Sequence, residues 1–573
     1  MTRTNKSRRR FLRHVPALGF FGASLPAAWA RAQAKAAALL DARTIGAALE
    51  AVGVKASKEE SAALARPADW SLKQYFARRE TRIHETTSPA TSFAPWPAAR
   101  ESADVRFKPS VQAVPARPAD LESVAYWPVC KLAALVRSRR VSSVELTGMY
   151  LARLRRYNPE LNCVVTFLDE TAMQEAKKAD EEIAKGKYRG PLHGIPWGAK
   201  DLIAAKGAPT TWGHEAFKSR SLEYDATVVE LLREAGAVLI AKLTTGALGK
   251  GDLWFGGQTR NPWNTADGAN GSSAGPASAV GAGCVPFALG TETGGSLIAP
   301  AARCGVTGLR PTFGRISRYG VMPLAWTLDR VGVMARTAED TALVARALSK
   351  PDARDLSADG RPFGWDHTYR LTKLKLGVLT ASFDALAEDA AKKNAENTLS
   401  ILAKLGAKDP RPIQVPETNT DIEWLGAETL AFFDQVARGD SRFEVPGYMK
   451  AWWLIPAAEY VRAQRLRAEQ LQELNRALAG VDVYVVASDF TAARKAPESD
   501  AAKSARAAAA AHFHLANLAG LPCVTVPNGL NADGQPTNIT FYARPFEEWK
   551  LLTVAKAFQD ATDYASSRPP KFT

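Results

Sequence analysis

Short apolar runs that alternate with helix-like segments most constrain the fold of this chain. Residues 237–241 read Ala-Val-Leu-Ile-Ala, and residues 481–486 and 523–526 are further runs of the buried-strand kind. Each run is reached through a helical or loop segment. Because strands that alternate with helices form a sheet layered with helices, the sequence predicts an α/β fold.

Local signals place helices between these runs. Ser142–Glu145 has the form of a capping box, and apolar residues follow at helical spacing until Asn158-Pro159, where we expect the helix to stop. Asp225 is expected to cap a second helix that ends at Gly236. The alanine-rich segment 504–520 predicts a helix near the C-terminus.

The first 34 residues have the composition of an export signal. A basic segment precedes an apolar stretch over 16–29 and the small-residue patterns that end at Ala30 and Ala34, after either of which we expect cleavage. The stretch is too short and too interrupted to span a membrane, so stable membrane insertion is not expected. Residues 7–12, Ser-Arg-Arg-Arg-Phe-Leu, resemble a twin-arginine signal. This predicts transient contact with the twin-arginine export machinery and a periplasmic or secreted protein.

Composition divides the rest of the chain into two parts. Residues 35–85 read helical and residues 86–119 are punctuated by proline, so 35–120 is interpreted as an N-terminal helical extension with a proline-rich strap. Residues 121–573 are expected to form the main domain. A chain of 573 residues with 46% hydrophobic residues can bury a large core there.

Charge and cysteine content argue against two classes of partner. The net charge is +15, of which the seven basic residues in 1–34 supply 7 and leave +8, so no nucleic-acid partner is demanded. The five cysteines are scattered without metal-ligand spacing, and we expect buried free thiols and no metal site. They are Cys130, Cys163, Cys284, Cys304 and Cys523.

Two blocks rich in glycine and serine lie in the middle of the chain, at 270–283 and 290–296. Neither has the spacing of a phosphate-binding loop or a dinucleotide fingerprint, so no nucleotide cofactor is expected. Ser273 is the centre of a Gly-x-Ser-x-Gly pattern, but the preceding "RNPWNTADGAN" has loop chemistry where a nucleophile elbow needs a strand. The histidines that could serve it, His512 and His514, lie in the alanine-rich helix.

Lys200 ends the segment "GPLHGIPWGAK", which is made of glycine, proline and apolar residues. A lysine desolvated in such a setting can lose its proton near neutral pH and act as a base. Taken alone, it could equally be a surface lysine whose stem covers apolar surface.

Four motifs follow one another along the chain: "GIPWGAKD" (194–201), "NGSSAGPASAVGAG" (270–283), "GTETGGS" (290–296) and "CGVTGLRPTFGRISRYGVMP" (304–323). In this order they resemble the amidase signature family of serine hydrolases. The likeness runs from about residue 124 to the C-terminus. It implies the fold of that family, a large mixed β-sheet flanked by helices on both faces.

The resemblance also implies a site without histidine, metal or organic cofactor. The nucleophile is Ser296, the base is Lys200, and the relay between them is Ser272, which follows a cis peptide bond and lies 24 residues before Ser296. A serine hydroxyl becomes a good nucleophile when a base takes its proton, here through a second hydroxyl. The residues expected to bind the oxyanion or substrate, mainly through backbone amides, are Thr293, Gly294, Gly295 and Ser273, with the amide of Ser296.

By this resemblance the protein is an amidase that hydrolyses a small-molecule carboxamide through an acyl-serine, releasing ammonia or an amine. The family commonly has aspartate and arginine where this chain has Glu292 and Ile298, so Glu292 is expected to find another partner. His193 is interpreted as a structural histidine, and Asp329 as a turn or salt-bridge residue.

Two alternatives stay open. The chain also resembles the A subunit of tRNA-dependent amidotransferases, which releases ammonia from glutamine for use on aminoacyl-tRNA held by partner subunits, although an export signal argues against it. An inactive relative that only binds an acyl compound is the other. The amide substrate and the oligomeric state are not readable from the sequence.

Overall fold

A computed structural model describes residues 40–80, 106–407, 410–415, 422–487 and 500–573, which form two compact units. The first unit contains residues 40–80 and 422–466, and the second contains the other described residues. The segment interpreted as an export signal, residues 1–34, lies outside the described residues. So does the cleavage site after Ala30 or Ala34.

The first unit is helical. Leu49 of α3 and Leu64 of α4 pack in a small apolar cluster with Ile45 and Ala68. Residues 422–466, which the sequence pattern placed in the main domain, belong to this unit instead. Its elements are α3 (Ala42–Ala51), α4 (Lys58–Glu80), η5 (Glu423–Leu425), α14 (Gly426–Gly439) and η6 (Gly447–Leu454), and α15 (Ala457–Ala477) begins in it.

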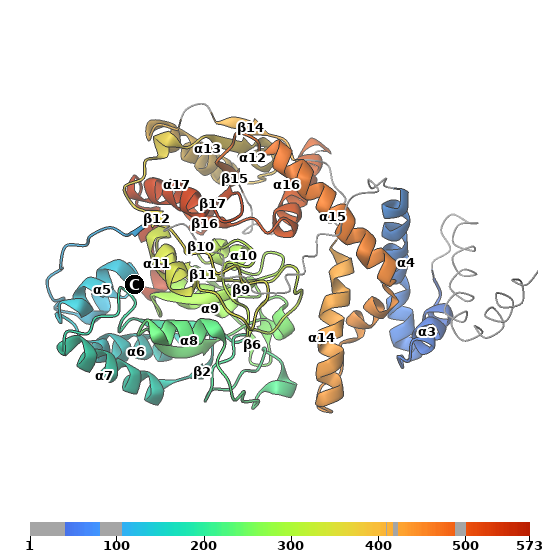
Figure 1. Cartoon of the computed structure of the whole chain (residues 1–573), viewed down its shortest axis with the longest axis horizontal. Helices are drawn as coiled ribbons and strands as arrows, with labels where there is room; N and C mark the ends of the chain where they lie inside the picture. The colour runs from blue at the N-terminus through green and yellow to red at the C-terminus, as the bar shows by residue number, and fades with distance from the viewer. Residues whose placement is uncertain (1–39, 81–105, 408–409, 416–421, 488–499) are drawn as a thin grey trace, which may run out of the picture. The chain divides into compact units, whose positions relative to one another are not determined.

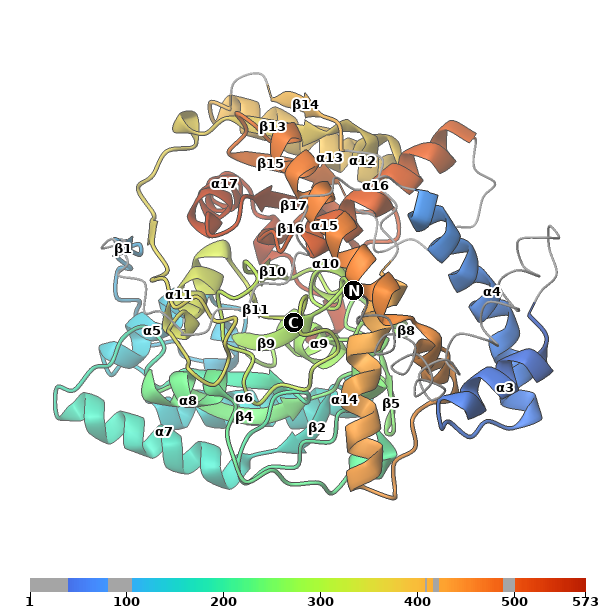
Figure 2. The same ribbon diagram turned by 45° about the vertical axis from the view of Figure 1, so that its right-hand side comes forward.

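The second unit is built on an 11-stranded sheet with the order β14-β13-β15-β17-β16-β10-β11-β9-β3-β4-β2 (Figures 1 and 2). The sheet is mixed: β3 runs parallel to both β4 and β9, and β13 parallel to β14 and β15, while the other neighbours are antiparallel. The strands are β2 (Val164–Phe167), β3 (Pro196–Lys200), β4 (Val238–Leu243), β9 (Phe287–Glu292), β10 (Thr307–Arg310), β11 (Arg330–Ala335), β13 (Leu376–Leu379), β14 (Arg411–Ile413), β15 (Val483–Ala487), β16 (Cys523–Leu530) and β17 (Pro536–Ala543). The three predicted apolar runs are therefore strands, in β4, β15 and β16.

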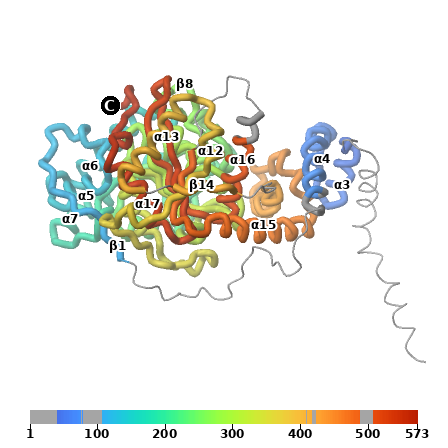
Figure 3. Tube along the Cα trace, turned by 90° about the horizontal axis from the view of Figure 1, so that it is seen from above, coloured from blue at the N-terminus to red at the C-terminus, as the bar shows by residue number. Residues whose placement is uncertain are grey.

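The two faces of the sheet carry separate apolar cores, because successive side chains of a strand point to opposite faces. In β15, Val483 and Val485 pack into one core, and Tyr484 and Val486 into the other. Helices cover both faces, as expected for this fold, and Figure 3 shows several of them from above. Those that contribute to the first core include α11 (Ala338–Leu348), α13 (Asp389–Lys404) and α17 (Glu548–Asp560), and those of the second include α10 (Ile298–Arg303) and α16 (Asp500–Leu518).

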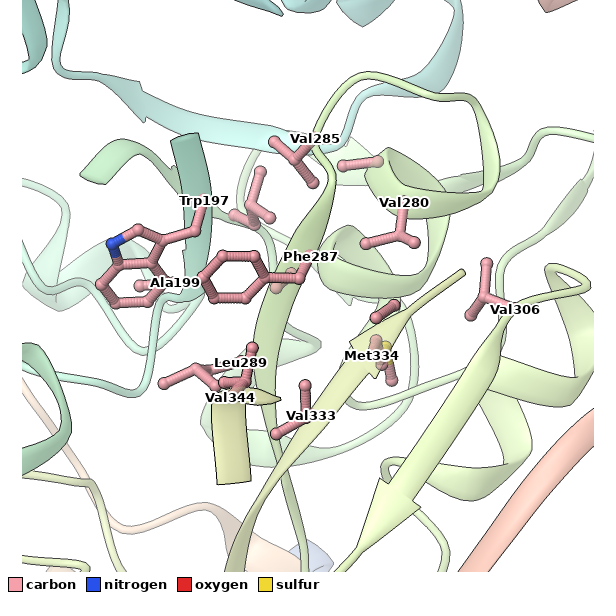
Figure 4. Close-up of a cluster of buried hydrophobic side chains, with 14 of the residues drawn as sticks. Trp197, Ala199, Val280, Val285, Phe287, Leu289, Val306, Val333, Met334 and Val344 are labelled. Atoms are coloured by element: carbon pink, nitrogen blue, oxygen red, sulfur yellow. The ribbon is translucent and has the colours of Figure 1, made fainter. Parts of the chain in front are cut away.

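A stacked aromatic pair links two neighbouring strands of the sheet, β3 and β9. Trp197 of β3 and Phe287 of β9 stack with ring centroids 6.1 Å apart and planes 5° from parallel (Figure 4). Both side chains are almost fully buried, and such pairs contribute about 0.5–1.5 kcal/mol beyond their buried area. The stack holds β3 against β9, and the ends of these two strands carry the residues expected to form the site.

Helix α6 (Ser143–Leu161) confirms the predicted capping box and extends past the predicted stop. Pro159 lies inside its last turn. The helix ends at Asn162, which has a left-handed conformation (φ 48°), and the Asn158 side chain accepts hydrogen bonds from the next two amides, at 2.9 Å each. Two asparagines, and not the proline, therefore terminate the helix, because they satisfy the backbone groups left at its end.

Two other local predictions were wrong. Asp225 does not cap α8 (Thr227–Glu234): the N-cap is Ala226, and the Asp225 carboxylate instead accepts from the Lys206 amide at 2.8 Å and from Arg233 at 2.5 Å. The Asp225 carboxylate thus binds these two partners in the folded chain instead of the amides of the first turn of α8. Residues 260–270, expected to be loop, contain the short hairpin of β7 (Arg260–Asn261) and β8 (Asn264–Gly268). All five cysteines are free thiols, and four of them are buried as predicted, whereas Cys130 is only half-buried.

Candidate functional site

The candidate site lies where parallel strands β9, β3 and β4 end at one edge of the sheet. Ala199 pairs with Leu289 across β3 and β9, so Lys200, the last residue of β3, lies beside the end of β9. Chain segments that follow the carboxyl ends of parallel strands converge at such an edge. The register thus brings Lys200 next to the "GTETGGS" block.

Lys200 is fully buried and its amine contacts three hydroxyl groups. Its Nζ lies 2.7 Å from Ser272 Oγ, 3.0 Å from Ser273 Oγ and 2.8 Å from Thr291 Oγ1. Burial lowers the pKa of Lys200 well below its usual range, against the opposing charges of Asp329 and Glu292. The site therefore favours a neutral amine, which can accept a proton.

The two neighbouring serines differ in what their hydroxyl protons can do. Ser273 Oγ donates to Thr291 O at 3.0 Å and accepts from the Thr291 amide at 3.1 Å, so its proton is engaged by the backbone. Ser272 Oγ contacts Lys200 and, within the described chain, has no other hydrogen-bond partner. A neutral amine has two protons and one lone pair for its three contacts. Of the two serine hydroxyls, that of Ser272 is therefore the one that can donate to the lone pair of Lys200.

The backbone before Ser272 is held close to a neighbouring loop. The Gly271–Ser272 peptide bond is cis, as the resemblance implied, and Asn270 before it has φ 63°. A Cβ at Gly271 would collide with the carbonyl oxygen of Gly251, so only glycine fits there. Helix α9 (Ala274–Gly281) then begins with Ser273 as its N-cap. Ser273 is fully buried, and it contacts Lys200 and Thr291 rather than open space.

Ser296 lies in the loop between β9 and α10 and is half-buried. A hydrogen bond of 2.9 Å from the Ser273 amide to the Ser296 carbonyl joins the two glycine and serine blocks. In the part of the chain that the structure describes, Ser296 Oγ forms no hydrogen bond with Ser272 or Lys200. Lys200 thus contacts Ser272 directly. Ser296 is linked to this pair only through the backbone hydrogen bond between its carbonyl and the amide of Ser273.

The loop from Thr293 to Ser296 presents backbone donors. None of these four amides has a protein acceptor among the described residues. Gly295 has φ 109°, a conformation that side chains rarely adopt, and a Cβ there would lie 3.1 Å from the Phe513 ring. Four amides without acceptors beside a serine can bind an anion or an oxyanion.

Glu292 binds the backbone that follows this loop. Its Oε2 accepts from the amides of Leu297 and Ile298 at 3.0 and 2.9 Å, and its Oε1 lies 2.7 Å from Arg310 in a fully buried ion pair. Burial raises the pKa of Glu292, but Arg310 and Arg330 outweigh it, so the pKa lies below its usual value. The expectation of another partner is confirmed, and the partner is Arg310.

Replacing Glu292 with glutamine is expected to reduce the free energy of unfolding by about 3–5 kcal/mol, because Arg310 loses its buried counter-charge. The matched control is Glu234→Gln, which breaks the exposed Lys350 pair and is expected to cost less than about 1 kcal/mol. Urea unfolding measures both.

Low pH should remove the difference in unfolding free energy between wild type and Glu292→Gln. A carboxylate whose pKa is lowered in the folded state stabilises the fold above its unfolded pKa, and this contribution is lost as the pH falls through the folded value. The gap between wild type and Glu292→Gln should therefore close in acid. A loss as small as that of Glu234→Gln at pH 7 would contradict the support role.

Two of the described histidines have partners outside this cluster. His512 is buried and contacts the Tyr484 hydroxyl at 2.9 Å, and burial lowers its pKa to about 3. His193 accepts from the Arg189 amide at 3.1 Å and lies 3.4 Å from Glu182, as expected of a structural histidine. The partner of Ser273 is a lysine, so the structure does not support a serine-histidine elbow.

Sequence reasoning missed two polar contacts of the site. Thr291 contacts Lys200, and Asp329 accepts a hydrogen bond from Thr293 Oγ1 at 2.6 Å. Thr291 lies inside the quoted "GTETGGS" block, which was the available signal, but its contact depends on the register of β3 with β9. The sequence predicts a turn or salt-bridge residue at Asp329, and its carboxylate does accept from two amides of its own turn.

Two further expectations concern ligands and membranes. Over the described ranges, no cluster of histidine, cysteine, aspartate and glutamate has an arrangement that could bind a metal ion. Among the helices of the described residues, none is both long enough and apolar enough to cross a bilayer.

Comparison with known proteins identifies relatives over most of the chain. A family model described as Amidase matches residues 145–552. The A subunit of the glutamyl-tRNA(Gln) amidotransferase of Methylococcus capsulatus is 35% identical, over 77% of this chain and 98% of that protein. The peptide amidase of Stenotrophomonas maltophilia matches with a TM-score of 0.65 and 28% identity, over 78% of this chain and 99% of that one. A 6-aminohexanoate cyclic dimer hydrolase, with a TM-score of 0.69 and 24% identity over 78% and 100%, shares the fold.

Proposed function

The chain belongs to the amidase family, and from this premise we propose that it hydrolyses a carboxamide through Lys200, Ser272 and Ser296. The observation that carries the proposal is the fully buried amine of Lys200, which contacts hydroxyl groups and favours its neutral form. Of the two serines that contact this amine, Ser272 is the one whose proton is not engaged by another acceptor among the described residues.

The reaction begins when Ser296 Oγ attacks the carbonyl carbon of the amide. The proton of Ser296 passes to Ser272 Oγ while the proton of Ser272 passes to Lys200 Nζ. The carbonyl oxygen becomes an oxyanion and accepts hydrogen bonds from the amides of 293–296. The carbon–nitrogen bond then breaks as the proton returns through Ser272 to the leaving nitrogen, which departs as ammonia or an amine.

Water completes the cycle. It attacks the acyl-Ser296 ester, gives a proton to Lys200 through Ser272, and forms a second oxyanion at the same amides. Collapse of this intermediate returns the proton to Ser296 and releases a carboxylic acid, which loses its own proton to water and becomes the carboxylate. The protons of the two attack steps are carried by Ser272 and Lys200.

The test combines a probe with a substrate panel. Purified protein is treated with a fluorophosphonate and its intact mass is measured, and ammonia or amine release is assayed with peptide, aryl, fatty and cyclic amides and with glutamine. Labelling together with turnover of one class supports the proposal and names the substrate class. Neither labelling nor turnover would overturn it and favour an inactive acyl-binding relative.

A second candidate function is glutaminase activity of the amidotransferase type. It is favoured by the 35% identity to the A subunit of a glutamyl-tRNA(Gln) amidotransferase. Turnover restricted to glutamine, together with co-purification of partner proteins from the cytoplasm, would select it. Turnover of other amides by the isolated chain would select the hydrolase.

Export through a twin-arginine signal is part of the proposal for the hydrolase, supported by the sequence of residues 1–34. Full-length protein with a C-terminal tag is expected in the periplasm or medium in a shortened form. Replacing Arg8, Arg9 and Arg10 together with lysine should leave the uncut chain in the cytoplasm. Cytoplasmic full-length wild type would overturn the export proposal and leave the amidase proposal standing.

A further inference from the structure

Strands β9 and β11 bring Asp329 opposite the start of the donor loop, which comprises residues 293–296. The two strands are antiparallel, and the pairing Arg330 with Glu292 is the last of their register. One step beyond it, residue 329 lies across from residue 293. There Thr293 Oγ1 donates to Asp329 Oδ1 at 2.6 Å, a length typical of a bond to an ionised carboxylate.

The second oxygen of Asp329 fixes its own turn. Oδ2 accepts from the Leu324 amide at 2.7 Å and from the Ala325 amide at 3.0 Å. With both oxygens engaged, the carboxylate has one orientation available to it. The turn at 324–329 and the start of the donor loop are therefore joined through a single side chain.

The donor loop, residues 293–296, is thus fastened at its two ends by two carboxylates. Glu292 binds the amides that follow the loop, at Leu297 and Ile298, and Asp329 binds the hydroxyl at its first residue. Between them lie Gly294 and Gly295, which have no side chains to restrict their peptide planes. Without the bond at Thr293, the near end of this segment is held only by the backbone of β9, which ends at Glu292.

We propose that Asp329 is a positioning residue for the hydrolysis proposed above, on which this inference rests. Through the hydroxyl of Thr293 it sets the direction of the 293–296 amides, so that they converge where negative charge develops on the substrate oxygen. Donors placed in advance stabilise the transition state more than the bound substrate. Asp329 itself does not contact the reacting atoms.

The charge of Asp329 provides a readout that a purely structural residue lacks. The carboxylates of Asp329 and Glu292 both raise the pKa of Lys200, against the larger effect of burial. The amine is otherwise lined by the hydroxyls of Ser272, Ser273 and Thr291, which do not titrate near neutral pH. Burial raises the pKa of Asp329 itself, and the hydrogen bond from Thr293 and the charge of Arg318 oppose this only in part.

The experiment compares Thr293→Val, Thr293→Ser, Asp329→Asn and the double variant Asp329→Asn/Thr293→Val. Thr293→Val is expected to lower kcat by about 10- to 100-fold with KM changed less than about 3-fold, because the lost stabilisation acts in the transition state. Thr293→Ser should recover most of that kcat. Asp329→Asn should lose a similar factor, and the double variant should lose little more than the worse single variant.

The pH profile separates charge from shape. Asp329→Asn removes a negative charge near Lys200, so the acid limb of kcat/KM should move to lower pH, whereas Thr293→Val should leave that limb in place. The matched control is the exposed turn pair in which Thr368 Oγ1 donates to Asp366 Oδ1, also at 2.6 Å. Thr368→Val and Asp366→Asn are expected to leave kcat and the limb unchanged.

Any one of four outcomes would overturn the role of Asp329. Wild type that neither labels with fluorophosphonate nor hydrolyses any amide overturns the proposed function and this role with it. Active wild type with an unchanged kcat in Thr293→Val overturns the role of Asp329 alone. Additive losses in the double variant, or an unmoved acid limb in Asp329→Asn, also overturn it, because they separate the two side chains or remove the charge coupling.

Discussion

Replacing Ser296 with alanine is expected to lower kcat by on the order of 10⁴-fold or more and to abolish the fluorophosphonate adduct. The hydroxyl is the group that forms the acyl intermediate, and no other side chain takes its place in the proposed scheme. The unfolding free energy should change by less than about 1 kcal/mol, because Ser296 is half-buried and its Oγ forms no hydrogen bond among the described residues. Loss of turnover in a variant of unchanged stability would show that Ser296 acts in the reaction and not in holding the fold.

The matched control is Ser273→Ala, at the centre of the Gly-x-Ser-x-Gly pattern. Ser273 contacts Lys200 and the Thr291 backbone, so its loss should reduce kcat by only about 10- to 100-fold and leave the adduct in place. An adduct that survives in Ser296→Ala and vanishes in Ser273→Ala would reverse the assignment. Intact-mass spectrometry of the two labelled variants decides between them.

Replacing Lys200 with methionine is expected to lower kcat/KM by about 10²- to 10⁴-fold, the range for removal of a general base. Activity of wild type should rise as the pH increases through the lowered pKa of Lys200, since only the neutral amine accepts a proton. The Lys200→Met variant should lack that acid limb. A pH–rate profile of both proteins measures this, and an identical acid limb in the variant would exclude Lys200 as the base.

The titration of Lys200 should also appear in the pH dependence of the unfolding free energy. Between the lowered pKa of the folded state and about 10.4 in the unfolded chain, the unfolded state binds more protons, so wild type gains stability as the pH rises. Lys200→Met removes this titration, and the stability of wild type relative to the variant should therefore increase with pH. Urea unfolding at several pH values measures the difference.

A second buried lysine offers the contrast. Lys242 of β4 is also fully buried, but its Nζ lies 2.7 Å from Asp201, which is buried as well. Lys242→Met leaves that carboxylate without its counter-charge and is expected to cost about 3–5 kcal/mol. Lys200, with hydroxyl partners, should show a much smaller loss at neutral pH. Equal losses would mean that Lys200 is held as a charged group.

Local signals predicted the elements better than their ends. The apolar runs of β4, β15 and β16 and the capping box of α6 follow from patterns within a few residues, because burial and helix capping are local in sequence. The predicted end of α6 and the predicted cap of α8 were wrong. At α6 the error was one of local interpretation, because two asparagines at the end of the helix satisfy the backbone where a proline was expected to stop it. At α8 the Asp225 carboxylate binds the Lys206 amide and Arg233 instead of the first turn, and the contact with Lys206 depends on the folded chain.

The sequence by itself determined the family and the residue types of the site, since four ordered motifs carry a lysine, two serine blocks and a glycine loop. Only the tertiary structure decided which serine can yield its proton to Lys200, that Arg310 is the partner of Glu292, and that Asp329 binds Thr293. The physical reason is register. Each contact joins segments on different strands and loops. The hydroxyl of Ser273 is fully hydrogen-bonded only because its own segment meets Lys200 of β3 and Thr291 of β9 at one end of the sheet.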